Sequence, residues 1–257
     1  MNINFAQLEI AGETNSGTVR HHNEDSFLIY APPDGSAVLA AVADGIGGHS
    51  HGEIASHICC TALFQAARSV DSSKWTTEFL RDTLLRANEK IFNINFLSRR
   101  AKPMGCTVAA AIFFRDRMIT ASAGDSRIYE YLRGRGRKAL KQLTVDHRPE
   151  NFHRLRIDPR FSRASLISRS LGTGKFLKLD IAEYPRCDEA KYLICSDGLY
   201  SSMSDIALAG ILGDGNSMRS KTGALICGAI LAGERDNITV ICAGTAEREN
   251  LYGTSGS

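Results

Sequence analysis

The feature of this sequence that most constrains its fold is a short apolar run that stops at an acid and a glycine. Residues 37–43 are Ala-Val-Leu-Ala-Ala-Val-Ala, and Asp44-Gly45 follows directly. Such a run is typical of a buried strand. Three more glycines occur by residue 52, and glycine lets the backbone approach a ligand closely, so this strand end could present a carboxylate and backbone carbonyls to one cation. An ordinary strand-to-helix turn explains the stretch equally well, because Asp-Gly is a common turn dipeptide.

The same pattern returns where the apolar run Tyr192–Cys195 ends in Ser196-Asp197-Gly198. Apolar residues at helical spacing, such as Leu80, Leu84 and Ile91, predict helices between the two runs. In chain order we expect one strand over 3–11, a second that ends at residue 30, and further strands over 37–43, 107–114, 118–123, 126–132, 192–195 and 238–242. We expect helices over 53–68, 77–96, 204–212 and 217–232. This alternation of strands and helices predicts an α+β fold of layered sheets and helices.

Composition and charge narrow the class of protein. Of the 257 residues, 43% are hydrophobic and 23% charged, as in a soluble globular protein, and the net charge of +3 is too small to indicate nucleic-acid binding. No apolar run reaches the ~18 residues of a membrane span, and the first residues lack a signal-peptide pattern. Seven cysteines without a Cys-x-x-Cys pair indicate reduced thiols in a cytoplasmic protein, and five of them lie in apolar surroundings: Cys59, Cys60, Cys195, Cys227 and Cys242.

Two basic segments are open to more than one interpretation. Arg133–Lys138 resembles the Arg-Gly segments that bind single-stranded nucleic acid, but it is short and lacks interleaved aromatics, so we favour a hairpin tip. Residues 148–166 contain five arginines and few apolar residues, which indicates an excursion from the core. Residues 246–257 end in Gly-Thr-Ser-Gly-Ser and are expected to form a flexible tail.

Acidic residues gather at the predicted strand ends: Glu24, Asp25, Asp44, Asp125, Asp197 and Asp236. Layered sheets could bring several of these ends to one rim, where carboxylates would repel one another unless cations lay among them. Oxygen ligands favour Mg²⁺ or Mn²⁺, and such acids suit a two-metal centre with ions ~4 Å apart. Arg20 offers a planar fork to phosphate oxygens. Together they suggest hydrolysis of a phosphate ester by metal-bound water, although a solvated sheet edge explains residues 20–25 equally well on their own.

Eight short motifs point to a known family. They occur in the family's order and span about residues 17–243, and the eight stretches cover residues 20–25, 42–49, 104–107, 124–127, 143–147, 167–172, 195–199 and 236–239. Through these motifs the chain resembles the bacterial metal-dependent protein phosphatases of type 2C. Each motif is weak alone, but eight in order are specific.

The resemblance implies a four-layer α-β-β-α sandwich of two antiparallel sheets flanked by helices, formed by one catalytic domain over residues 1–245. It implies that Asp44 bridges two Mn²⁺ or Mg²⁺ ions and that the Gly45 carbonyl ligates one of them. Asp197 and Asp236 would hold the other ion, and Arg20 would bind the substrate phosphate. The remaining roles are a catalytic one for Asp44 and Asp25, a direct or water-mediated metal contact for Glu24 and Asp25, and a weaker third-ion site at Asp125 with Asp197.

Two departures from the family pattern bear on mechanism and substrate. Eukaryotic members carry a histidine, often assigned as general acid, where Ile46 stands here, and His49 does not inherit that role by position. The leaving group could take its proton from a metal-bound water. The segment at 148–166 falls where the family has a mobile flap, but it is shorter and more basic. This suggests acidic or multiply phosphorylated targets, and a solvated loop is an equally good interpretation.

The resemblance also implies phosphorylated Ser/Thr proteins as substrates, a cognate bacterial Ser/Thr kinase, and a cytoplasmic monomer that binds neither nucleic acid nor membrane. Two rival interpretations remain. Cys242 and Arg248 match the Cys-x5-Arg spacing of cysteine-based phosphatases, but no Ser or Thr follows the arginine and the loop holds one glycine. The chain could also be a pseudophosphatase that binds phosphoproteins without turnover, although every expected metal aspartate is present.

Overall fold

The computed structural model describes residues 8–46, 51–98, 103–134, 139–148 and 167–245. Two five-stranded antiparallel sheets dominate it. The first sheet has the order β1 (Leu8–Asn15), β12 (Ile238–Thr245), β11 (Lys191–Cys195), β8 (Arg127–Tyr131) and β9 (Leu140–Gln142). The second has the order β10 (Asp180–Pro185), β7 (Arg117–Ala123), β6 (Val108–Phe113), β3 (Val38–Ala43) and β2 (Ser26–Tyr30). A two-stranded sheet joins β4 (Gly45–Ile46) to β5 (Gly105–Cys106).

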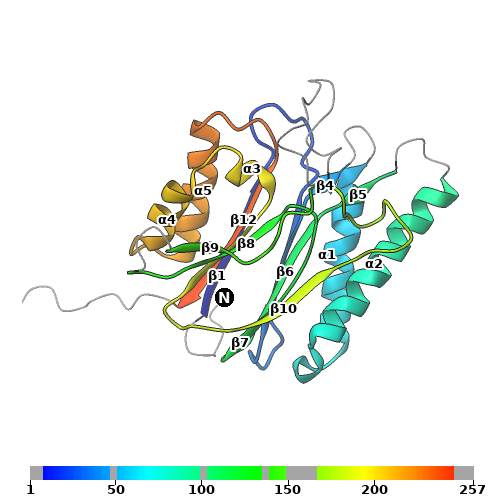
Figure 1. Cartoon of the computed structure of the whole chain (residues 1–257), viewed down its shortest axis with the longest axis horizontal. Coiled ribbons are helices and arrows are strands. Elements are labelled where there is room, and N and C mark those ends of the chain that lie inside the picture. Colours follow the sequence, from blue (N-terminus) through cyan, green and yellow to red (C-terminus); the bar gives the residue numbers. More distant parts are fainter. Residues whose placement is uncertain (1–7, 47–50, 99–102, 135–138, 149–166, 246–257) are drawn as a thin grey trace, which may run out of the picture.

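Helices cover the outer face of each sheet (Figure 1). The second sheet carries the long pair α1 (Gly52–Ser69) and α2 (Thr77–Leu97), joined through the short 3-10 helix η1 (Ser72–Lys74). The first sheet carries α3 (Asp197–Tyr200), α4 (Asp205–Gly213) and α5 (Met218–Leu231). The predicted α-β-β-α sandwich is therefore confirmed. In the part of the chain that the structure describes, no helix combines the length and the apolar character needed to cross a membrane.

The inner strand β3 shows why the predicted buried strands are apolar at every position. Leu39, Ala41 and Ala43 pack in the cluster that includes α1 and α2, whereas Val38 and Val42 pack between the two sheets. All six residues of β3 are buried. A strand covered on both faces has no solvent side, so its sequence loses the alternation that a half-exposed strand shows.

The four helices predicted from the sequence begin within one residue of the expected positions, whereas η1 and α3 were not predicted. The side chains of Thr76, Ser204 and Ser217 each accept a hydrogen bond from a backbone amide in the first turn of α2, α4 and α5, respectively. Such caps satisfy amides that have no partner inside the helix. In α2 the predicted stripe is buried at Leu80 and Ile91.

Some sequence expectations differ from the structure. The first strand runs from Leu8 to Asn15 rather than over 3–11, of which 3–7 lie outside the described residues. Strands β9 and β10 were not predicted, because they are short or polar: β10 is a partly exposed edge strand that ends in Pro185. The apolar setting expected for Cys227 is wrong, since it is exposed on α5, whereas Cys59, Cys60, Cys195 and Cys242 are buried. Strands β8 and β9, on either side of the basic segment, pair with each other as a hairpin requires.

Candidate metal centre

The ends of β2, β3, β11 and β12 bring the predicted acids to one end of the sandwich, toward the top of Figure 1. In the second sheet, Ser26 pairs with Ala43, so Asp25 before β2 and Asp44 after β3 leave the sheet side by side. In the first sheet, Cys195 pairs with Val240. Asp197 lies two residues after β11 and Asp236 two residues before β12, so both lie at the same end of this sheet. Sequence reasoning placed each acid at a strand end, and the antiparallel registers place those ends together.

Close backbone packing explains the glycine that follows each central aspartate. A Cβ on Gly45 would lie 2.5 Å from the backbone carbonyl oxygen of Glu24. A Cβ on Gly198 would lie 2.1 Å from that of Asn237. Neither distance is possible for a side-chain carbon. Both Asp-Gly pairs therefore need glycine because a neighbouring chain segment passes directly over them.

Two hydroxyl groups fix the Asp25 carboxylate, and the Asn237 side chain fixes the backbone beside it. The Asp25 carboxylate accepts hydrogen bonds from the hydroxyls of Ser196 at 2.8 Å and Thr239 at 2.6 Å. The Asn237 side chain accepts from the Glu24 amide and donates to the carbonyls of Ser16 and His22. These three residues join the loop before β2 to the β11–β12 end. Sequence reasoning gave none of them a role.

The acids raise one another's pKa. Asp44 lies among protein atoms but keeps partial contact with solvent, and its pKa is well above the usual range because of burial and of repulsion from the surrounding aspartates. Burial, then repulsion from Asp125 and Asp236, raises the pKa of Asp197 to about 7. Burial raises the pKa of Asp25 to about 6 against the opposing effect of its two hydroxyl donors. Close carboxylates that keep access to solvent favour a bound cation.

Arg20 lies at the outer edge of this group. Its guanidinium donates to Asp236 at 2.8 Å, and both side chains are more than 40% exposed. A cavity of about 700 Å³ opens beside it, lined by residues of the loop before β2 and of the start of α1. The half-buried Glu24 also lines this cavity, and burial with repulsion from Glu53 raises its pKa. The cavity therefore puts open space next to the predicted phosphate-binding arginine.

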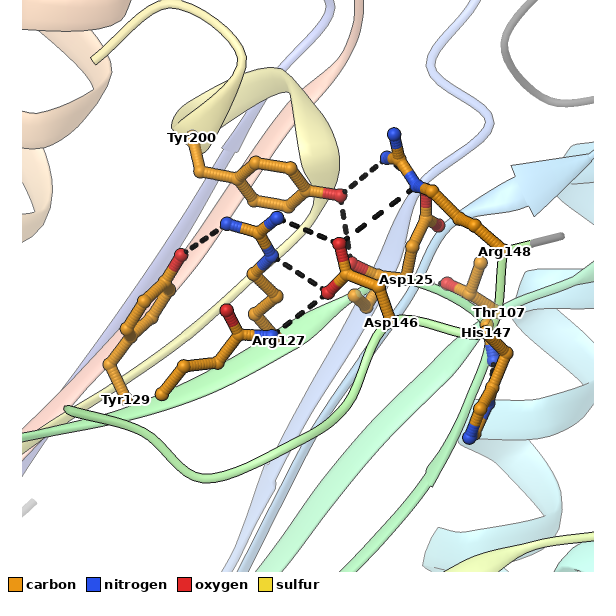
Figure 2. Close-up of polar contacts among 11 residues, drawn as sticks. Thr107, Asp125, Arg127, Tyr129, Asp146, His147, Arg148 and Tyr200 are labelled. Atoms are coloured by element: carbon orange, nitrogen blue, oxygen red, sulfur yellow. Dashed lines mark hydrogen bonds and ion pairs between the residues drawn. The ribbon is translucent and has the colours of Figure 1, made fainter. Parts of the chain in front are cut away.

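Asp125 lies in the turn between β7 and β8 in a different environment. Its carboxylate accepts two hydrogen bonds from Arg148, and the hydroxyl of Tyr200 donates to its backbone carbonyl (Figure 2). The neighbouring Arg127 makes a two-bond ion pair with Asp146. The sequence motifs included Arg127 and Asp146, but they gave no sign of these contacts.

The donors suit Mn²⁺ or Mg²⁺, because they are carboxylate oxygens and a strand-end backbone carbonyl. One buried oxygen, Oδ1 of Asp125, has no hydrogen-bond partner among the described residues. In that same part of the chain, no three carboxylate, imidazole or thiol side chains already converge as one ligand set. The site thus offers the donor chemistry of a metal centre, with side chains that must turn toward an ion to ligate it.

Several sequence predictions fall elsewhere. His49, Arg248 and the segment 149–166 lie outside the described residues. Cys242 lies within β12, paired with Ala11 on one side and Leu193 on the other. It is fully buried, and burial raises its pKa to about 12. A protonated thiol inside a sheet does not form the anion-binding loop that a cysteine-based phosphatase requires, so this rival is wrong.

Comparisons with known proteins match this geometry. The protein phosphatase 2C family matches over residues 18–224. The chain is 30% identical to the serine/threonine phosphatase stp of Listeria monocytogenes over 239 residues, which is 89% of this chain and 92% of that protein. It is 32% identical to the serine/threonine protein phosphatase PstP of Mycobacterium tuberculosis over 247 residues, or 92% of this chain and 45% of that protein.

A solved structure extends the likeness to three dimensions. The catalytic domain of PstP, in complex with two manganese ions, superposes with a TM-score of 0.77 at 30% sequence identity. The match covers 93% of this chain and 99% of that one. Sequence, fold and the grouping of acids at the strand ends agree, and the chain belongs to the protein phosphatase 2C family of serine/threonine protein phosphatases.

Proposed function

We propose that this chain removes phosphate from phosphoserine and phosphothreonine of proteins at a centre of two Mn²⁺ or Mg²⁺ ions. The groups that would hold the ions are the carboxylates of Asp44, Asp197 and Asp236 and the backbone carbonyl of Gly45. The observation that carries the proposal is the grouping of these acids at one end of the sandwich, where the ends of β2, β3, β11 and β12 meet. The two manganese ions of the PstP catalytic domain support the same assignment.

Bound ions would offset the charge of these acids and lower the pKa of a water that attacks phosphorus. The chain's own side chains would bind the substrate phosphate and orient the attacking water. The Arg20 guanidinium would bind the phosphate oxygens in place of Asp236, which leaves that carboxylate to the metal side. Asp25, fixed by Ser196 and Thr239, would position the attacking water, and Glu24 would act directly or through a water. The cavity beside Arg20 has room for residues that flank the phosphorylated side chain.

The wider setting is also part of the proposal. Residues 1–245 would form one catalytic domain, followed by a flexible tail at 246–257. The protein would act as a cytoplasmic monomer in signal transduction and reverse a cognate Ser/Thr kinase, without nucleic-acid or membrane binding. A basic segment over 148–166 would favour acidic targets. Asp125 with Asp197 would be the place of any third ion.

Hydrolysis of a phosphothreonine peptide with Mn²⁺ tests the proposal. Asp44→Ala and Asp197→Ala should each abolish turnover while circular dichroism stays that of the folded protein. Asp82→Ala, which removes an exposed carboxylate from α2, is the matched control and should keep full activity. If the unmutated protein shows no turnover with Mn²⁺ or Mg²⁺ but binds the phosphopeptide, the protein is a phosphoprotein-binding pseudophosphatase.

A further inference from the structure

Arg148 is hydrogen-bonded to the carboxylate of Asp125, the residue to which the proposed function assigns any third ion. Its Nη2 and Nε atoms donate to Oδ2 of Asp125 at 2.5 and 3.1 Å, so both bonds converge on one oxygen (Figure 2). The Asp125 side chain is 3% exposed and that of Arg148 is 16% exposed. Charge-assisted hydrogen bonds of this kind are about twice as strong as those between neutral groups. The protein thus supplies a cation of its own at this acid.

Further contacts hold Arg148 in place. Its Nη2 also donates to the hydroxyl of Tyr200 at 3.0 Å, and that hydroxyl donates to the Asp125 backbone carbonyl at 2.9 Å. The Tyr200 ring lies under Arg127, whose guanidinium carbon is 3.5 Å from the ring centroid. Arg127 in turn is fixed by two bonds to Asp146. Side chains from α3, β8 and the segment after β9 therefore build the position of Arg148.

We infer that Arg148 is a built-in counter-cation that lowers the affinity of Asp125 for a third divalent ion, so that this chain holds two ions tightly rather than three. The inference rests on the proposed function, because it takes the two-ion centre at Asp44 and Asp197 as given. Arg148 is a residue that sets metal stoichiometry and not one that touches the reacting atoms.

The two oxygens of Asp125 show why the ion and the guanidinium compete. Oδ2 is engaged by Arg148, whereas Oδ1 is buried without a hydrogen-bond partner in the described part of the chain. An ion at Oδ1 would lie close to a like charge, and an ion at both oxygens would displace Arg148. An opposite charge at this distance changes the proton affinity of a carboxylate by about 1–3 pKa units, and a comparable effect on an ion is about ten- to thousandfold.

Calorimetric titration of the full chain with Mn²⁺ tests the inference, with bound metal counted by elemental analysis after dialysis. The unmutated protein should bind two ions tightly and a third only at high concentration. In Arg148→Ala the third ion should bind at least about tenfold more tightly. Adding Asp125→Asn to that variant should remove the gain. Arg81→Ala deletes an arginine from the exposed face of α2 and is the matched control, expected to leave all three affinities unchanged.

A second variant separates the loss of the Arg148 charge from a loss of folding. Arg148→Gln keeps a hydrogen-bond donor for Asp125 and removes only the charge, and it should show the same gain in third-ion affinity. A third ion bound equally by the unmutated protein and both Arg148 variants would overturn the inference, as would no third ion in any variant. An unmutated protein that binds no Mn²⁺ at all would instead refute the two-ion centre and thereby the proposed function.

Discussion

Two groups of acids lie at the same end of the sandwich, and their carboxylates have opposite electrostatic surroundings. The inner acids, Asp25, Asp44 and Asp197, have hydroxyls and one another as neighbours, and burial with mutual repulsion raises their pKa values. The paired acids, Asp125 and Asp146, each accept two hydrogen bonds from an arginine. An arginine neutralises each paired acid, whereas the pKa values of the inner acids stay raised, so the cations in the described part of the chain do not offset the burial and repulsion of these acids. That difference supports the proposal that the inner acids bind exogenous cations.

The variant Asp44→Asn is the strongest test of this difference between the inner and the paired acids. We expect Mn²⁺-dependent hydrolysis to fall by at least about a thousandfold, because a ligand that contributes several kcal/mol to the transition state is lost. We expect the melting temperature of the metal-free protein to rise, since one source of repulsion is removed. Steady-state kinetics and calorimetry measure the two effects. A metal-free melting temperature that falls would show that Asp44 is already compensated within the protein.

The pH dependence of stability tests the inner acids together. The folded pKa values of about 6 for Asp25 and about 7 for Asp197 exceed the unfolded value near 3.9, so the unfolded chain loses these protons first. The stabilisation from these groups is complete below about pH 4 and is lost as pH rises through 6 and 7. For Asp25 alone the loss is on the order of 3 kcal/mol.

Thermal unfolding of metal-free protein between pH 4.5 and 8 should therefore show a falling melting temperature. Saturating Mn²⁺ should oppose the fall, because ions bind the deprotonated carboxylates. Asp197→Asn should flatten the metal-free profile. A metal-free protein that becomes more stable from pH 5 to pH 8, with no change in that variant, would contradict the raised pKa values.

Asp146→Asn examines the paired acids and should give a smaller effect of opposite sign. It weakens the two-bond ion pair with Arg127 and the contact with Gln142. Both charged side chains are about one-fifth exposed, so we expect a loss of roughly 2 kcal/mol and a fall in melting temperature of about 4–8 °C. Tight binding of two Mn²⁺ ions should persist. Loss of those two ions in this variant would show that the two groups of acids act as one site.

The inner acids could be found from sequence because their signal is local. A strand buried on both faces is apolar throughout, as at Val38–Ala43, and an acid that ends it is conspicuous. The partners of these acids could not be found in this way. Ser196 and Thr239 reach Asp25 across 171 and 214 residues, and Arg148 meets Asp125 across 23. Those contacts depend on how the strand ends meet, and a single sequence does not encode them as a pattern. Edge strand β10 was missed for a related reason, since an exposed strand gives no strong apolar signal.

The smallest expected effect comes from Cys242, which lies in the interior of β12. Its backbone is paired on both sides, and its thiol has a pKa of about 12 because of burial, so it stays protonated at neutral pH. Cys242→Ala should cost about 1 kcal/mol of stability through the lost side-chain contacts and should change phosphopeptide hydrolysis by less than about twofold. EDTA should abolish hydrolysis in the variant and the unmutated protein alike. Activity that survives EDTA but disappears in Cys242→Ala would assign catalysis to the thiol and remove the inner acids from the mechanism.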